Sequence, residues 1–80
     1  MARQRVRFTF SADMVREPII YRLGHDFDVV TNIRRADVRA DMGWVVLELD
    51  GTDDEIQRGL TWVADNGVRV DPIAGDVIEG

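Results

Sequence analysis

The amino-acid sequence predicts an α+β domain in which two helices pack on one face of a four-stranded antiparallel sheet. Alternating apolar residues mark four strands, apolar residues at helical spacing mark two helices, and the order along the chain is β-α-β-β-α-β. Eighty residues form one small domain. We expect this domain to extend over residues 1–74, with residues 75–80 as a flexible C-terminal tail.

The first strand and the first helix come from the N-terminal third of the chain. In "RVRFTF" the residues Val6, Phe8 and Phe10 share one face, as in a half-buried strand. Pro18 suits the first turn of a helix, where its missing N–H group costs nothing. Gly24 would allow a neighbouring element to approach this helix closely. The predicted core stripe of the helix consists of Ile19, Ile20, Leu23 and Phe27.

The middle of the chain is predicted to form an antiparallel hairpin. The segment "GWVVLELDG" alternates cleanly, so that one face carries Val45, Leu47 and Leu49. Its other face carries Trp44, Val46 and Glu48. The preceding segment "DFDVVTNIRRADV" ends a helix and continues as a strand, and the connection "ADMG" is short and contains a glycine.

Alternation is imperfect in the first strand of this hairpin. Ile33 falls out of phase with the apolar residues around it, which are Val30, Ala36 and Val38. This mismatch indicates either a β-bulge or an apolar residue on the open sheet face. Asn32 is unfavourable in a strand, and consecutive Arg34 and Arg35 would point to opposite faces. The segment is therefore either a recognition site or an edge strand protected by charge.

The second helix has the clearest boundaries. Thr52 and Glu55 form a T-x-x-E capping box, and acidic residues occupy the first turn, where the helix dipole is positive. Asn66 and Gly67 provide a C-terminal stop, and "VRVDPI" follows as a short last strand closed by Pro72. The predicted buried stripe consists of Ile56, Leu60, Val63 and Ala64.

This order of elements predicts a ferredoxin-like βαββαβ sandwich, because it contains two split β-α-β units. Both helices then lie on one face, and no element of the chain covers the other face of the sheet. That open face would carry Trp44 and Val46 together with Arg7, Thr9 and Glu48. An exposed apolar patch often marks an interface. We therefore expect a homodimer formed through the sheet face or edge, with a tolerated surface tryptophan as the alternative.

Composition excludes several classes of function. The formal net charge of -5 argues against nucleic-acid binding, which needs a basic surface. The absence of cysteine excludes disulfides, thiolate nucleophiles and cysteine-held zinc or iron–sulfur clusters in this chain. No apolar run approaches the roughly 20 residues that span a bilayer, and no signal peptide is evident. We expect a cytoplasmic protein without membrane insertion and without a cofactor.

No arrangement of residues predicts catalysis or a metal site. His25 is the single histidine, and it lies near the end of the first helix, where a polar residue is ordinary. The single serine, Ser11, is not part of a nucleophile elbow, and no glycine-rich phosphate loop is present. We expect a protein that is not an enzyme.

The segment "TNIRRAD" offers groups that suit a free amino acid. Asn32 provides donors and an acceptor, and Arg34 and Arg35 provide planar forks for a carboxylate. Ile33 and Trp44 would provide apolar walls. On spacing alone a second interpretation stays open, in which Asn32 shapes the turn into the strand and the arginines guard its edge.

The chain resembles the NIL domain, a small ferredoxin-like regulatory module named after an Asn-Ile-Leu signature. The resemblance runs almost end to end, through "EPIIYRLGHDFDVVTNI", "GWVVLELDG" and "EIQRGLTWVADNGVRVDPI". It depends on the joint order and spacing of these segments more than on any one motif. The residues that stand where the family pattern has them are Pro18, Asn32, Ile33, Gly51, Trp62 and Gly67.

The resemblance implies a regulatory function. NIL domains occur at the C-terminus of the ATPase subunit of methionine ABC importers, where they bind methionine, lower its uptake and pair as dimers. The Asn of the signature is implicated in binding and matches Asn32. Other NIL domains, fused to iron–sulfur ferredoxins and associated with sulfur transfer in homocysteine and methionine synthesis, carry segments more similar to this chain. Arg34 replaces the signature Leu, so that a carboxylate fork stands where the family has an apolar wall.

Two functions follow as hypotheses. In the first, the chain is a homodimeric sensor that binds methionine or a related sulfur amino acid at the subunit boundary. Its ligand-binding residues would be Asn32, Ile33, Arg34, Arg35 and Trp44. In the second, it is an accessory docking protein for a sulfurtransferase or iron–sulfur protein, with no ligand of its own. We expect any signal to pass to a separate protein, such as a transporter ATPase.

Overall fold

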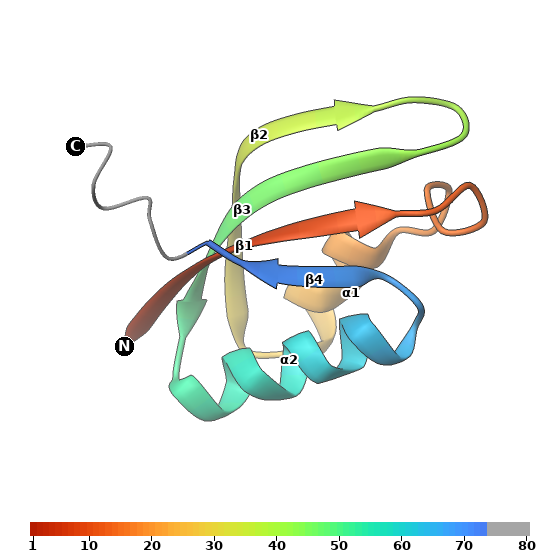
Figure 1. Ribbon diagram of the computed structural model, residues 1–80. Coiled ribbons are helices and arrows are strands. Elements are labelled where there is room, and N and C mark those ends of the chain that lie inside the picture. The colour runs from red at the N-terminus through yellow and green to blue at the C-terminus, as the bar shows by residue number, and fades with distance from the viewer. Residues whose placement is uncertain (74–80) are drawn as a thin grey trace.

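The computed structural model describes residues 1–73, and these form one antiparallel sheet covered by two helices (Figure 1). The strands lie in the order β2-β3-β1-β4. This order confirms the predicted ferredoxin-like α+β sandwich. The predicted domain end at residue 74 and the predicted tail 75–80 lie outside the described residues. The elements are β1 (Ala2–Phe10), α1 (Ile19–Asp26), β2 (Val29–Val38), β3 (Gly43–Gly51), α2 (Asp53–Asp65) and β4 (Arg69–Pro72).

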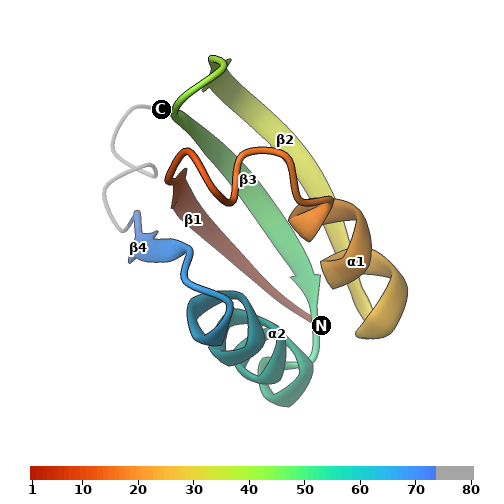
Figure 2. The same cartoon turned by 90° about the vertical axis from the view of Figure 1, so that its right-hand side faces the viewer.

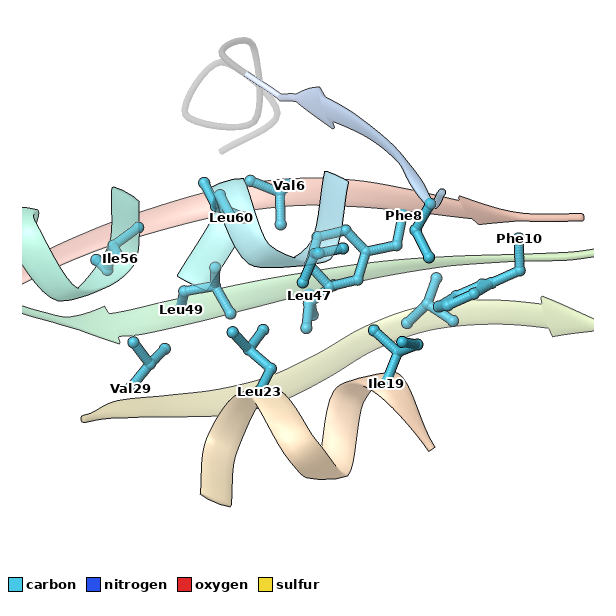
Figure 3. Close-up of a cluster of buried hydrophobic side chains, with 13 residues drawn as sticks. Val6, Phe8, Phe10, Ile19, Leu23, Val29, Leu47, Leu49, Ile56 and Leu60 are labelled. Carbon is cyan, nitrogen blue, oxygen red and sulfur yellow. The ribbon is translucent and has the colours of Figure 1, made fainter. Parts of the chain in front are cut away.

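The hydrophobic core lies between the sheet and the helices (Figure 3). Alternate residues of β1 and β3 point into it, and Phe8 and Leu47 are fully buried. Ile19 and Leu23 of α1 point toward the sheet from the other side. All buried side chains among residues 1–73 are apolar, so most polar side chains of the strands lie on the sheet face that the helices do not cover. The core comprises Val6, Phe8, Phe10, Ile19, Leu23, Val29, Val45, Leu47, Leu49, Ile56, Leu60, Val63 and Val68.

The two helices meet at a glycine, but not at the one the sequence indicated. A Cβ atom at Gly59 of α2 would come within 2.6 Å of Leu23 Cδ1 in α1. A Cβ atom at Gly24 would make only ordinary contacts, the nearest at 3.7 Å. Gly59 is therefore the residue that permits close helix packing. Pro18 also differs from the prediction, because it precedes the helix as its N-cap and α1 begins at Ile19.

α2 begins and ends at the predicted signals. Thr52 Oγ1 accepts a hydrogen bond from the Glu55 amide at 3.2 Å. The Glu55 carboxylate accepts from the Asp28 amide at 2.9 Å, which ties the helix to the loop before β2. Gly67 has a φ of 90°, the left-handed conformation of a helix stop. Ala64 was predicted in the buried stripe but is exposed, because it lies beside the α2–β4 groove rather than under the sheet.

The outer half of β2 extends beyond the helix layer. Figures 1 and 2 show both helices on one side of the sheet and the β2–β3 hairpin projecting away from them. Ile33 pairs with Leu47 and Val38 pairs with Gly43, positions on the helix side of the sheet, yet the exposed fractions of Ile33 and Val38 are 54% and 59%. β2 is also an edge strand, which was one of the two interpretations of its sequence. An edge with exposed apolar side chains is a surface suited to pairing.

Candidate functional site

A β-bulge in β2 determines which side chains reach the open face of the sheet. Ile33 pairs with Leu47, and the next pair joins Arg35 to Val46, so Arg34 is the extra residue. The bulge cancels the alternation that would separate the two arginines. The expectation that Arg34 and Arg35 point to opposite faces is therefore wrong, and both belong to the open face. β2 bends along its length, as bulged strands do (Figure 1).

The bulge also explains the pattern of apolar residues in β2. With one extra residue, Ile33, Ala36 and Val38 all fall on the helix side of the sheet. Val30 then points to the open face, where 62% of it is exposed. Of the two explanations that the sequence left open, the structure shows the bulge.

The strand register arranges the open face in four rows that cross the sheet. Carboxylates and arginines stand side by side in these rows, which favours pairing across strands. The rows are Val30, Asp50 and Arg3; Asn32, Glu48 and Arg5; Arg35, Val46, Arg7 and Asp71; and Asp37, Trp44, Thr9 and Arg69.

Glu48 is the centre of the polar network on this face. Arg5 Nη2 donates to Glu48 Oε2 at 2.5 Å, and Arg34 Nη1 lies 3.8 Å from Glu48 Oε1. The hydrogen bond from Arg5 lowers the pKa of the Glu48 carboxyl, and the positive charge of Arg34 adds to this effect. Only 12% of the Glu48 side chain is exposed, so a fixed negative charge lies in the floor of the face.

A cleft lies between this network and the end of β4. Its volume is about 240 Å³, and its lining combines cationic and apolar side chains. Arg34 is both partly exposed and paired with an acidic residue, with 48% of its side chain exposed beside Glu48. The lining residues are Arg5, Arg34, Arg35, Val46 and Ile73.

The single chain places four of the five residues predicted to bind a ligand on one face, and two of them, Arg34 and Arg35, line the cleft. Asn32, Arg34 and Arg35 project from β2 onto the open face. Trp44 lies on the same face, one row beyond Val46, and is half-buried. Arg7 covers it, with the guanidinium carbon 4.9 Å from the ring centroid. Ile33 lies on the opposite face of β2, so it does not join the other four within one chain.

Four residues of the site were not predicted to bind a ligand, and they are Arg5, Val46, Glu48 and Ile73. Arg5, Glu48 and Ile73 come from three different strands or their ends, and only the sheet register brings them together. A faint signal was available, because Arg5 and Glu48 are both polar residues on open-face positions of alternating strands. Arg5 and Glu48 become neighbours because of the order of the strands in the sheet, and no local sequence pattern predicts that order.

The side chains on this face are of the kinds that bind a charged ligand. Among residues 1–73 no three His, Cys, Asp or Glu side chains gather as a metal-ligand group. His25 lies away from the cleft, in the last turn of α1, where its Nδ1 is 2.9 Å from Asp26 Oδ1. No helix in the described part of the chain is long and apolar enough to cross a bilayer. The cleft has two exposed arginines and apolar walls, and the Glu48 carboxylate lies beside it, which are groups that suit a zwitterion.

Comparison with known proteins supports the same conclusion about fold and family. The model of the NIL domain family matches residues 4–72. The methionine import ATP-binding protein MetN 1 of Enterococcus faecalis is 31% identical over 68 residues, which cover 80% of this chain and 19% of that protein. The chain therefore spans less than a quarter of that relative. The C-terminal domain of an ABC transporter ATP-binding protein from Enterococcus faecalis has the same fold, with a TM-score of 0.78 at 19% identity. That alignment covers 89% of this chain and 83% of the solved domain.

Proposed function

This chain belongs to the NIL domain family, and on that premise we propose that it is a non-catalytic, cytoplasmic regulatory domain that binds methionine or a related sulfur amino acid. One observation carries the proposal. The bulge in β2 turns Arg34 and Arg35 onto the face that holds Asn32, beside a cleft of about 240 Å³. The name of the relative, a methionine import ATP-binding protein, supports the choice of ligand.

The cleft offers a partner for each part of an α-amino acid. Arg34 and Arg35 provide forks for the carboxylate. Glu48 and the Asn32 amide oxygen accept from the ammonium group. Val46 packs against the apolar side chain of the ligand. This assignment adds Glu48 to the binding residues proposed from the sequence.

The existing ion pairs leave Arg34 as well as Arg35 available to a ligand. Arg5 is hydrogen-bonded to Glu48 at 2.5 Å, whereas Arg34 is 3.8 Å from the same carboxylate. Arg34 can therefore turn to an incoming carboxylate while Arg5 still neutralises Glu48. An exchange of this kind replaces one charge contact by another and leaves no buried charge unpaired.

We propose that the domain acts as a homodimer joined along β2. The edge of β2 exposes three apolar side chains, Val30, Ile33 and Val38. A chain of 80 residues also buries a small core, so that pairing adds useful apolar burial. Ile33 then lies at the subunit boundary on the helix side of the sheet, where it adds to the dimer contact rather than to the cleft.

Sedimentation equilibrium tests the dimer. We expect Ile33→Glu to give a monomer at concentrations where the unchanged protein is a dimer, because it places a charge in the contact. Met42→Glu is the matched control, since Met42 is also exposed but lies in the β2–β3 turn. A monomeric unchanged protein, or equal dissociation of both variants, would contradict the proposed interface.

Isothermal titration with methionine tests the ligand site. We expect Arg35→Gln to weaken binding by about tenfold or more, because a charge-assisted hydrogen bond is lost. Arg3→Gln is the control, since Arg3 lies on the same face but pairs with Asp50 away from the cleft. Equal affinity in Arg35→Gln and Arg3→Gln would remove Arg35 from the site.

A signal reaches another protein if the ligand binds two states of this domain with different affinity. A transporter ATPase is the partner that fits the relative in Enterococcus. The second candidate function is docking to a sulfurtransferase or an iron–sulfur protein. The placement of Arg34, Arg35 and Trp44 on one face favours it, because arginine and tryptophan are enriched at interface hot spots. Titrations that are flat for all sulfur amino acids would select this second function.

A further inference from the structure

Charge is separated between the two faces of the domain. The strands place six arginines and four carboxylates on the open face, a formal charge of +2. The other four arginines and nine carboxylates of residues 1–73 lie in helices, turns and loops, a formal charge of -5. An acidic chain therefore presents one cationic face. The open-face charges are Arg3, Arg5, Arg7, Arg34, Arg35 and Arg69 with Asp37, Glu48, Asp50 and Asp71.

The carboxylates of the face already have partners, and some arginines do not. Asp50 pairs with Arg3 at 2.8 Å, and Asp71 pairs with Arg69 at 3.0 Å. Within the described residues, Arg7 and Arg35 form no ion pair. These two arginines stand on either side of Val46 in one row. The uncompensated positive charge of the face is therefore concentrated at its centre.

The centre of the face is also apolar. Trp44 and Val46 are half-buried there, and arginine side chains surround them. A polar rim around an apolar centre that is rich in arginine and aromatic residues is typical of protein–protein interfaces. A uniformly charged polyanion fits less well, because four carboxylates of this face would oppose it. A protein surface can instead present carboxylates to some positions and apolar groups to others.

We propose that the open face of the sheet docks an acidic surface of another protein. Carboxylates of the partner pair with Arg7 and Arg35, and apolar side chains of the partner pack on Trp44 and Val46. The overall charge of -5 repels an acidic partner from every other direction, so the cationic face sets the orientation of approach. This docking does not require an amino acid in the cleft, so it goes beyond the sensing function proposed above.

Fluorescence anisotropy with a labelled peptide of twelve residues tests the proposal. The peptide alternates pairs of Glu and Asp with Leu, and the same peptide with Lys in place of the acids is the charge-inverted control. We expect the acidic peptide to bind in 50 mM salt, to weaken about tenfold at 300 mM, and to bind more tightly than the basic peptide. Equal binding of both peptides would overturn the proposal.

Two double variants with the same change of charge locate the surface. Arg7→Glu with Arg69→Glu alters the open face outside the cleft, and we expect about tenfold weaker peptide binding. Arg16→Glu with Arg22→Glu alters the α1 region, and we expect less than about twofold change. Equal losses in both would mean that the peptide responds to net charge alone. If the melting temperature of a Glu variant falls, Arg7→Gln with Arg69→Gln replaces it.

Competing ligands separate the remaining outcomes. A single-stranded oligonucleotide of twelve residues and vesicles with anionic phosphatidylserine are tested in the same salt. Tighter binding of either one would contradict an acidic protein partner, since the face would then prefer phosphate. Methionine titration of the Arg7→Glu, Arg69→Glu variant tests the ligand site independently, because neither residue lines the cleft. Loss of peptide binding with retained methionine binding concerns the docking face alone. Loss of methionine binding with retained peptide binding concerns the ligand site alone.

Discussion

Arg34 Nη1 lies 3.8 Å from Glu48 Oε1 across the open face of the sheet, although its neighbour Arg35 projects from the same face. Consecutive residues of a regular strand point to opposite faces. The β-bulge between Ile33 and Arg35 removes this restriction and joins the edge strand to the central carboxylate. One extra residue in β2 thus allows two consecutive arginines to lie on the open face, with Arg34 beside Glu48.

Removal of one residue tests the role of the bulge. A chain that lacks Arg34 can keep both flanking pairs, Ile33 with Leu47 and Arg35 with Val46, in one regular ladder. We expect this deletion to fold, with a melting temperature within about 8 °C of the unchanged protein. Deletion of Asp37 is the control, because it shifts the remaining residues relative to β3 and places Val38 on the other face. We expect the Asp37 deletion to have a clearly lower melting temperature than the Arg34 deletion. A lower melting temperature for the Arg34 deletion would contradict the assigned bulge.

Helix packing gives opposite expectations for two glycines. Gly59→Ala places a Cβ atom 2.6 Å from Leu23 Cδ1, and we expect a loss of about 1–3 kcal/mol in the free energy of unfolding. Gly24→Ala meets no contact below 3.7 Å, and we expect a gain of about 0.5–1 kcal/mol from helix propensity. Urea denaturation of both variants measures the difference. A stabilised Gly59→Ala variant would show that the helices can separate without loss.

The depressed pKa of Glu48 predicts how stability responds to acid. A carboxyl whose pKa is lower in the folded state contributes stability above its ordinary pKa of about 4.3 and loses it as pH falls through the folded pKa. Glu48→Gln removes this contribution at every pH. We therefore expect the variant to melt at a lower temperature than the unchanged protein at pH 7, and the difference to shrink toward pH 3.

Melting curves at pH 7, 5, 4 and 3 measure this convergence. Asp54→Asn is the control, since Asp54 is an exposed residue of the first turn of α2. We expect it to change the melting temperature little at any pH. A melting-temperature difference between Glu48→Gln and the unchanged protein that stays constant down to pH 3 would show that the ionised Glu48 carboxylate is not the source of the stability.

The start of α2 depends on one hydroxyl group. Thr52→Ala removes the acceptor of the Glu55 amide, and we expect a loss of about 1 kcal/mol in unfolding free energy. Thr52→Ser keeps that acceptor and serves as the control. Chemical denaturation in urea distinguishes the two, and equal losses in both would assign the effect to the methyl group of Thr52.

Much of the fold could be predicted from the sequence. The alternation in β1 and β3 identified the residues of the core side, and the capping threonine and terminal glycine bounded α2. Such features are local, since strand periodicity and helix caps depend on residues that are close together in the sequence. The exposure of Ala64 was missed because its helical spacing fits the buried stripe, whereas in the structure Ala64 lines the open α2–β4 groove.

The site could be predicted only in part. Asn32, Arg34 and Arg35 stood out because they interrupt an apolar pattern. Their common face could not be predicted, since it depends on where the bulge occurs in the pairing of β2 with β3. Arg5 and Glu48 became partners through the register of β1 with β3, which is a non-local property. Gly59 was overlooked for the same reason, because its contact is with another helix.

A thermal-shift measurement with methionine tests the central claim most directly. At about 100 times its Kd a ligand adds about 2.7 kcal/mol, which should raise the Tm of this domain by roughly 10 °C. Methionine, homocysteine and cysteine are compared at millimolar concentration in the unchanged protein, in Asn32→Ala and in Thr31→Ala. We expect a shift with a sulfur amino acid that disappears in Asn32→Ala and persists in Thr31→Ala, whose side chain faces the helices. No shift with any of the three, or an equal shift in Asn32→Ala, would contradict it.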